Sequence, residues 1–139
     1  WHLYTDKYFI GTIKNNIDSG TFKAIQDAAV AAFNVDQSYI DKLNNMYQER
    51  RDAAEEGLRE LGWNIKPSKA TFYLWLPVPK GMTSEQFVTE MLEKAHVVVP
   101  PGNGYGKYGE GYFRVALTKD VETIKECIRR MKEAGIRYS

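Results

Sequence analysis

The sequence has few of the residues on which several classes of protein site depend. Its 139 residues include one cysteine and two histidines. One thiol cannot form an internal disulfide, and this set is too small for a closed zinc site built from cysteine and histidine. We therefore expect no metal site, a reduced and buried thiol at Cys127, and a cytoplasmic location.

Neither sign of charge is in surplus, because 19 lysines and arginines face 18 aspartates and glutamates. A general nucleic-acid binder needs a basic surplus to displace counterions, and a peripheral membrane binder needs one to meet anionic headgroups. The sequence also contains no apolar run near the ~20 residues that span a bilayer. These features predict no nucleic-acid partner and no membrane association.

Apolar spacing and capping residues predict four helices. Asp18 or Ser19 can cap a helix that carries Phe22 to Phe33, and a long helix from Ser38 to Leu61 ends at Gly62. Thr83 with Gln86 forms a capping box for a helix that reaches Ala95, and Asp120 can cap a last helix that Gly135 closes. Residues 1–14 show no period, so we expect that segment to be mobile or held by a partner.

Three strands are expected, at residues 70–76, 97–99 and 112–117. Helices that alternate with strands indicate an α/β fold or α+β sandwich, here a small three-stranded mixed sheet covered by helices. The first two strands should be parallel across a right-handed crossover, and the loop of about a dozen residues before the third allows it to run antiparallel to a neighbour. Because residues 70–76 are apolar on both faces, both sides of that strand should be covered.

The long helix from Ser38 to Leu61 is longer than so small a sheet needs. At ~1.5 Å per residue it extends about 36 Å, which predicts that it links the sheet to something else. Its charged residues, such as Arg51, Glu55 and Arg59, follow an i,i+4 spacing that is typical of a solvated face.

Residues 97–118, VVVPPGNGYGKYGEGYFRVALT, form the most informative stretch. Gly104, Gly106 and Gly109 match the spacing of a dinucleotide-binding loop, but that motif requires a helix after the glycines. A strand is expected here instead. We therefore interpret these glycines as an irregular loop that needs positive φ angles and close backbone approach.

In the strand that follows this loop, alternation places Tyr112, Arg114 and Ala116 on one face. The planar guanidinium of Arg114 suits a carboxylate or phosphate held by two parallel hydrogen bonds. The alternative is an edge arginine that pairs with Glu110 or with water. Residue type leaves both interpretations open.

Three segments, KNNIDSGTFKAIQDAA, FYLWLPVP and residues 97–118, resemble the C-terminal third of fold-type I pyridoxal-phosphate aminotransferases. The most similar branch is the LL-diaminopimelate and aspartate aminotransferase group. The resemblance implies a homodimeric enzyme that moves an amino group between an amino acid, diaminopimelate-like or aspartate-like, and a 2-oxo acid. Residues 34–139 correspond to the small domain, and residues 1–33 to its junction with the large domain.

The resemblance also assigns roles to particular residues. Arg114 matches the arginine that holds the substrate's α-carboxylate. Asn16, Ser19, Gly20 and Tyr112 are expected near the substrate or the cofactor. No residue matches the imine-forming lysine, because Ser68-Lys69 leads directly into a strand. We therefore expect no catalytic residue here, no binding of pyridoxal phosphate by this chain alone, and no activity without the rest of the enzyme.

A non-enzymatic alternative remains. The chain can be interpreted as a stand-alone α/β domain that binds a carboxylate or a protein partner through the strand that is apolar on both faces. The length of the source reading frame would separate the two interpretations.

Overall fold

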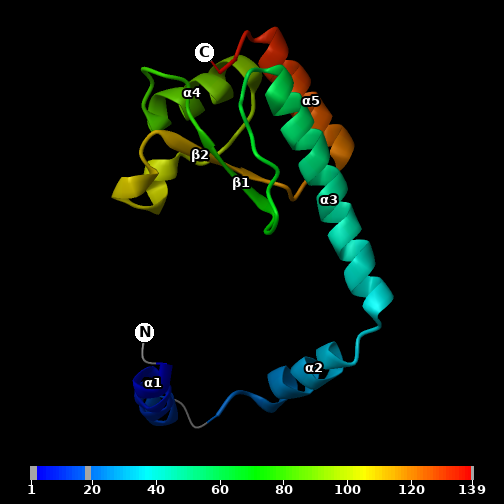
Figure 1. Cartoon of the computed structure of the whole chain (residues 1–139), viewed down its shortest axis with the longest axis vertical. Helices are drawn as coiled ribbons and strands as arrows, with labels where there is room; N and C mark the ends of the chain where they lie inside the picture. The colour runs from blue at the N-terminus through cyan, green and yellow to red at the C-terminus, as the bar shows by residue number, and fades with distance from the viewer. Residues whose placement is uncertain (1–2, 18–19, 139) are drawn as a thin grey trace. The chain divides into compact units, whose positions relative to one another are not determined.

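The computed structural model describes residues 3–17 and 20–138, with side chains from Phe9 onward. It divides the chain into two compact units that separate near Ile40. Figure 1 shows the first unit with helices α1 (Leu3–Ile17) and α2 (Lys23–Phe33), and the second with strands β1 (Tyr73–Pro77) and β2 (Tyr112–Ala116) and helices α4 (Ser84–Ala95) and α5 (Val121–Glu133). Helix α3 (Gln37–Glu60) begins in the first unit and continues in the second.

Helix α1 was not among the four predicted helices, and it shows that most of the segment in which no period was recognised is helical. Ile10, Ile13 and Ile17 follow helical spacing, a signal that the mixed aromatic residues before them obscured. Helix α2 was predicted, but its cap was not, since its N-cap is Phe22 without a side-chain capping bond. Asp18 and Ser19 lie outside the described residues.

The predicted ends of the later helices are confirmed. Helix α3 is followed by Gly62 with φ +100°, and α4 begins with the Thr83–Gln86 capping box. Asp120 caps α5 by accepting a hydrogen bond from the Thr123 backbone N–H at 2.8 Å. That bond holds the pKa of Asp120 below its ordinary value.

The sheet differs from the prediction, because the described residues form two antiparallel strands rather than three. Residues 97–99 have no strand pairing, and β2 meets the segment after them only through an antiparallel bridge from Phe113 to Pro101. The Arg114 N–H also donates to Pro100 O at 3.1 Å. Two consecutive prolines supply no N–H groups, so this segment cannot continue a ladder. The parallel pairing of the first two strands was therefore wrong, whereas the antiparallel direction of the last one is confirmed.

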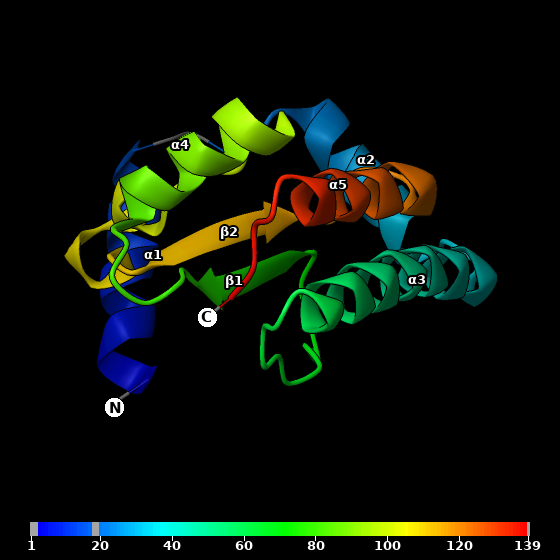
Figure 2. The same ribbon diagram turned by 90° about the horizontal axis from the view of Figure 1, so that it is seen from above.

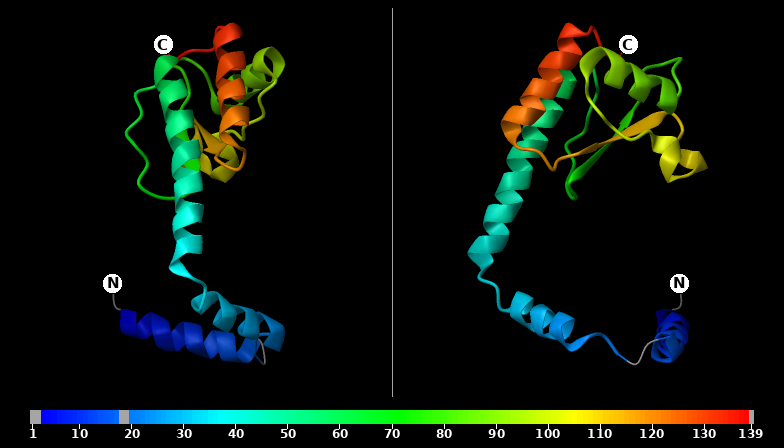
Figure 3. Two further views of the ribbon diagram at one scale, coloured as in Figure 1. Left: turned by 90° about the vertical axis from the view of Figure 1, so that its right-hand side faces the viewer. Right: turned by 180° about the vertical axis from the view of Figure 1, so that it is seen from behind.

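The core of the second unit lies on one face of this sheet. Leu74, Leu76 and Phe113 are buried there, and Phe113 is 0% exposed. Figure 2 shows α4 and α5 on the same side of the sheet, and Figure 3 shows α5 beside the C-terminal half of α3. Gly57 allows that approach, because a Cβ at this position would lie 2.6 Å from the Ile128 side chain.

Glu55 corrects the interpretation of the α3 charges as a solvated face, because its side chain is buried. One carboxylate oxygen accepts from Arg59 at 2.7 Å and the other accepts from the Ser68 backbone N–H at 2.9 Å. Arg51 donates to the Ser68 carbonyl at 2.9 Å. These hydrogen bonds hold the loop that leads to β1 against helix α3.

We expect Glu55→Ala to lower the free energy of unfolding by about 2 to 3 kcal/mol, because it leaves the Ser68 N–H without its acceptor and opens a cavity. Glu56→Ala is the control, since Glu56 is exposed on the same helix, and it should change stability by less than about 0.5 kcal/mol. Urea denaturation of the three chains measures both values. Equal stability of the two variants would contradict a structural role for Glu55.

Among the described helices, none combines the length and apolarity that crossing a bilayer requires.

Candidate functional site

The face of the sheet opposite the core carries Arg114. The strand register pairs Trp75 with Arg114, Tyr73 with Ala116 and Pro77 with Tyr112, so these side chains share one face. We call this face the aromatic face. The expectation that both sides of β1 are covered was wrong for the described residues, because Trp75 on this face is 44% exposed.

Aromatic rings surround the guanidinium of Arg114. Its Cζ atom lies 4.1 Å from the ring centroid of Tyr73 and 4.4 Å from that of Tyr105. Trp75 stacks with Tyr112 at 5.8 Å and meets Tyr105 edge-on at 5.7 Å. A cation attracted by ring faces is held in place without losing its charge.

Arg114 keeps its hydrogen-bonding capacity. Its Nε atom is the one buried side-chain nitrogen or oxygen without a hydrogen-bond partner in the described part of the chain. No hydrogen bond or ion pair joins Nη1 or Nη2 to a described residue either. The alternative pairing with Glu110 is wrong, because Glu110 accepts from the Ser84 backbone N–H at 2.8 Å instead. A planar pair of donors is thus available to a ligand.

The glycine loop that carries Tyr105 folds into two short 3-10 turns, η1 (Gly102–Tyr105) and η2 (Lys107–Gly109). Gly102 and Gly109 pack backbone to backbone, and a Cβ on either residue would overlap the other's carbonyl oxygen. Gly106 between the turns has φ +118°. Strand β2 follows the loop, so the dinucleotide motif was correctly rejected.

The start of α4 fixes this loop. The Ser84 hydroxyl oxygen accepts from the backbone N–H groups of Gly111 at 2.9 Å and Tyr112 at 3.2 Å. Asn103 donates to Glu85 at 3.3 Å. Sequence reasoning missed Ser84, because a serine after a capping threonine carries no signal for a partner 28 residues away.

The other predicted site residues fall into two groups. Tyr112 lies on the aromatic face with Arg114. Asn16 and Gly20 belong to the first unit, where Asn16 donates to Thr12 O at 2.7 Å and Gly20 has φ +116°. Their proximity to the substrate or the cofactor stays a prediction, and Ser19 lies outside the described residues.

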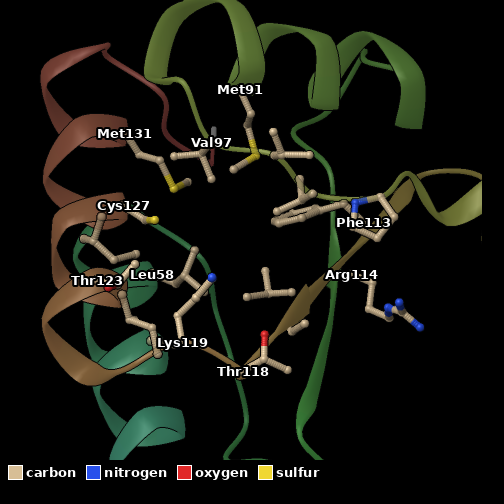
Figure 4. A pocket seen from close by; sticks show the side chains of 18 residues that line it. Leu58, Met91, Val97, Phe113, Arg114, Thr118, Lys119, Thr123, Cys127 and Met131 are labelled. Atoms are coloured by element: carbon tan, nitrogen blue, oxygen red, sulfur yellow. The ribbon is translucent and has the colours of Figure 1, made fainter.

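The second unit also contains an apolar cavity of about 230 Å3. In Figure 4, the Lys119 amine points into the cavity, whereas the Arg114 guanidinium points away from it. Cys127 lines the cavity and is half-buried rather than fully buried as expected. Burial raises the pKa of its thiol, which favours the unreactive protonated form.

The described residues can also be compared with what a metal ion and pyridoxal phosphate require. No group of histidine, cysteine, aspartate and glutamate side chains in the described ranges could hold a metal ion. Pyridoxal phosphate requires an imine lysine and donors for its phosphate. The groups that contact Arg114 on the aromatic face are rings, and Lys69 is exposed beside a loop serine that donates to Ala70 O.

Comparison with known proteins gives consistent matches. A family model described as aminotransferase class I and II matches residues 5–131. LL-diaminopimelate aminotransferase 2 of Trichormus variabilis is 55% identical over 130 residues, which are 94% of this chain and 33% of that protein. The chain spans about a third of the length of the curated relatives it matches.

Solved structures of aminotransferases also match this chain. An aminotransferase from Staphylococcus aureus matches with a TM-score of 0.80 and 30% identity, over 92% of this chain and 34% of that one. L,L-diaminopimelate aminotransferase from Chlamydomonas reinhardtii matches with a TM-score of 0.64 and 31% identity, over 70% of this chain and 24% of that one.

Proposed function

The chain belongs to the class I and II aminotransferase family, and from this premise we propose that it supplies the substrate-carboxylate arginine of a pyridoxal-phosphate aminotransferase. The enzyme moves an amino group between an amino acid and a 2-oxo acid. The names of the curated relatives support a diaminopimelate-like amino acid, and an aspartate-like one is the alternative that the sequence resemblance implies.

One observation carries this proposal. Arg114 is a half-buried cation on an open face, with two aromatic contacts and no carboxylate partner among the described residues. An arginine whose function is structural usually has an acidic or carbonyl partner. The free donors of Arg114 therefore suit an external carboxylate, and the rings beside it restrict access of water to one side of the ion pair.

The residues of this chain bind and orient the substrate. We assign them no step in which a covalent bond forms or breaks. Two parallel hydrogen bonds from Arg114 fix the rotation of the substrate's carboxylate, which sets the direction of the bonds at its Cα atom. The cofactor supplies an electrophilic aldehyde and an electron sink, and we assign its binding to the part of the enzyme that the relatives have beyond this chain.

We extend the proposal to the organisation of the enzyme. Residues 34–139 form its small domain, residues 1–33 lie at the junction with the large domain, and the enzyme works as a homodimer in the cytoplasm. The division of the chain into two units near Ile40 supports such a junction. Exposed apolar side chains on α1 and α2, such as Ile17 and Phe33, support contact with further protein.

We expect the source protein to show the absorbance of an internal pyridoxal-phosphate imine and to consume LL-diaminopimelate or aspartate with a 2-oxo acid. Residues 1–139 alone should form no saturable imine at micromolar cofactor, because no lysine has the surrounding contacts that hold the aldehyde. Absorbance titration of the two proteins checks both statements. A source protein of about this length, without the imine but with carboxylate binding, would support the stand-alone binding domain instead.

A further inference from the structure

Tyr105 reaches the aromatic face from a different part of the chain than the other rings. Tyr73 and Trp75 lie on β1 and Tyr112 lies on β2, whereas Tyr105 ends the first turn of the glycine loop. Its ring nevertheless contacts both Arg114 and Trp75. The loop therefore has a direct contact with the guanidinium that the proposed function requires.

We propose that Tyr105 is a positioning residue for the substrate carboxylate. Its ring fixes the plane of the Arg114 guanidinium, so that the Nη1 and Nη2 donors meet the ligand together. This inference rests on the proposed function, because it acts through Arg114. An arginine side chain loses considerable rotamer freedom when it binds, and a contact that orders it beforehand reduces the cost of binding.

The chemistry of the contact favours this role. A carboxylate partner would hold Arg114 equally well but would compete with the ligand for the same donors. A ring attracts the cation through its face and leaves the N–H groups in the guanidinium plane free. The enclosed Nε atom leaves the terminal nitrogens as the pair that a carboxylate can reach.

The position of Tyr105 is set by the backbone of the loop and not by the ligand. The contact between Gly102 and Gly109 closes the loop, and Ser84 holds its C-terminal end through two backbone N–H groups. Tyr105 itself is half exposed, so a smaller side chain can replace it without opening a core cavity. Its effect on binding can thus be measured separately from folding.

The test uses the full-length holoenzyme and succinate, a carboxylate that has no amino group to react. Tyr105→Leu should raise the Kd for succinate by about 2- to 30-fold, the range that a cation–π contact of moderate burial corresponds to. Tyr105→Phe keeps the ring and should stay within twofold of wild type. Calorimetric titration gives the Kd. In steady-state kinetics, Tyr105→Leu should raise KM and leave kcat within threefold of wild type.

Tyr108→Leu is the matched control. Tyr108 lies on the same loop, is 87% exposed and has Lys107 Nζ 4.9 Å from its ring centroid, so it offers the same contact type away from Arg114. Its removal should leave the Kd for succinate unchanged. A loss equal to that of Tyr105→Leu would mean that any disturbance of the loop weakens binding, and it would overturn the specific role of Tyr105.

Comparing the Arg114 and Tyr105 variants separates a failure of this inference from a failure of the proposed function. If Arg114→Lys binds succinate as tightly as wild type, the proposed function fails. If Arg114→Lys weakens binding and Tyr105→Leu does not, only the positioning role fails. In the Arg114→Lys background the Tyr105→Leu effect should shrink, and full additivity would overturn action through Arg114. Should Tyr105→Leu not fold, Tyr105→Met replaces it under the same criteria.

Discussion

Arg114→Lys in the full-length enzyme should lower kcat/KM about 30- to 5,000-fold for every α-amino acid tested. Lysine keeps the charge but offers a single point contact on a differently shaped stem, so affinity and alignment at the substrate's Cα atom are both lost. Loss of a charge-assisted pair in a partly dry site corresponds to about 2–5 kcal/mol. Steady-state kinetics measures the change.

The cofactor absorbance of Arg114→Lys should stay near that of wild type, because the proposed function assigns the cofactor's contacts to the rest of the enzyme. Arg130→Lys is the control for the exchange itself, since Arg130 is exposed on α5 and pairs with Glu126 at 2.8 Å. It should change kcat/KM by less than threefold. An Arg114→Lys enzyme that also stays within threefold would remove Arg114 from the substrate site.

Gly109→Ala should lower the free energy of unfolding by about 3 kcal/mol. A Cβ at this position overlaps the Gly102 carbonyl, and backbone on both sides of the contact must move because no flexible side chain can yield. The Ser84 hydroxyl also accepts from the Gly111 N–H, so the backbone just after Gly109 resists displacement. Urea denaturation of the 139-residue chain measures the loss.

Gly104→Ala is the matched control within the same loop. Its added Cβ would meet no atom within 4 Å, and its φ is not positive. Alanine there should leave stability unchanged or raise it by up to about 1 kcal/mol, because it restricts the unfolded chain. If Gly109→Ala proved as stable as Gly104→Ala, the tight contact with Gly102 would have no structural role.

The features predicted correctly from the sequence arise from local interactions. The Thr83–Gln86 box, the Asp120 cap and the left-handed Gly62 each depend on residues within a few positions, so the pattern contains the whole cause. Strand alternation likewise separated Arg114 from the buried Phe113. The family resemblance added the expected role of Arg114, which the residue type left open.

The features that the sequence could not decide depend on contacts between distant segments. The strand predicted at residues 97–99 does not form because Pro100 and Pro101, which follow it, have no N–H groups to donate to β2, and Glu55 is buried because Ser68 folds back onto α3. The local sequence pattern contains no signal for either of these long-range contacts.

The sequence by itself thus determined most helix boundaries, the rejection of the dinucleotide motif and the face of the sheet on which Arg114 lies. Only the tertiary structure decided that Glu110 is bonded to Ser84 and that Tyr73 and Tyr105 are the neighbours of Arg114. The physical reason is that helix caps, and the alternation of side chains between the two faces of a strand, are set by backbone geometry over a few residues. The partners of a charged side chain depend on which of many possible long-range contacts the folded chain makes.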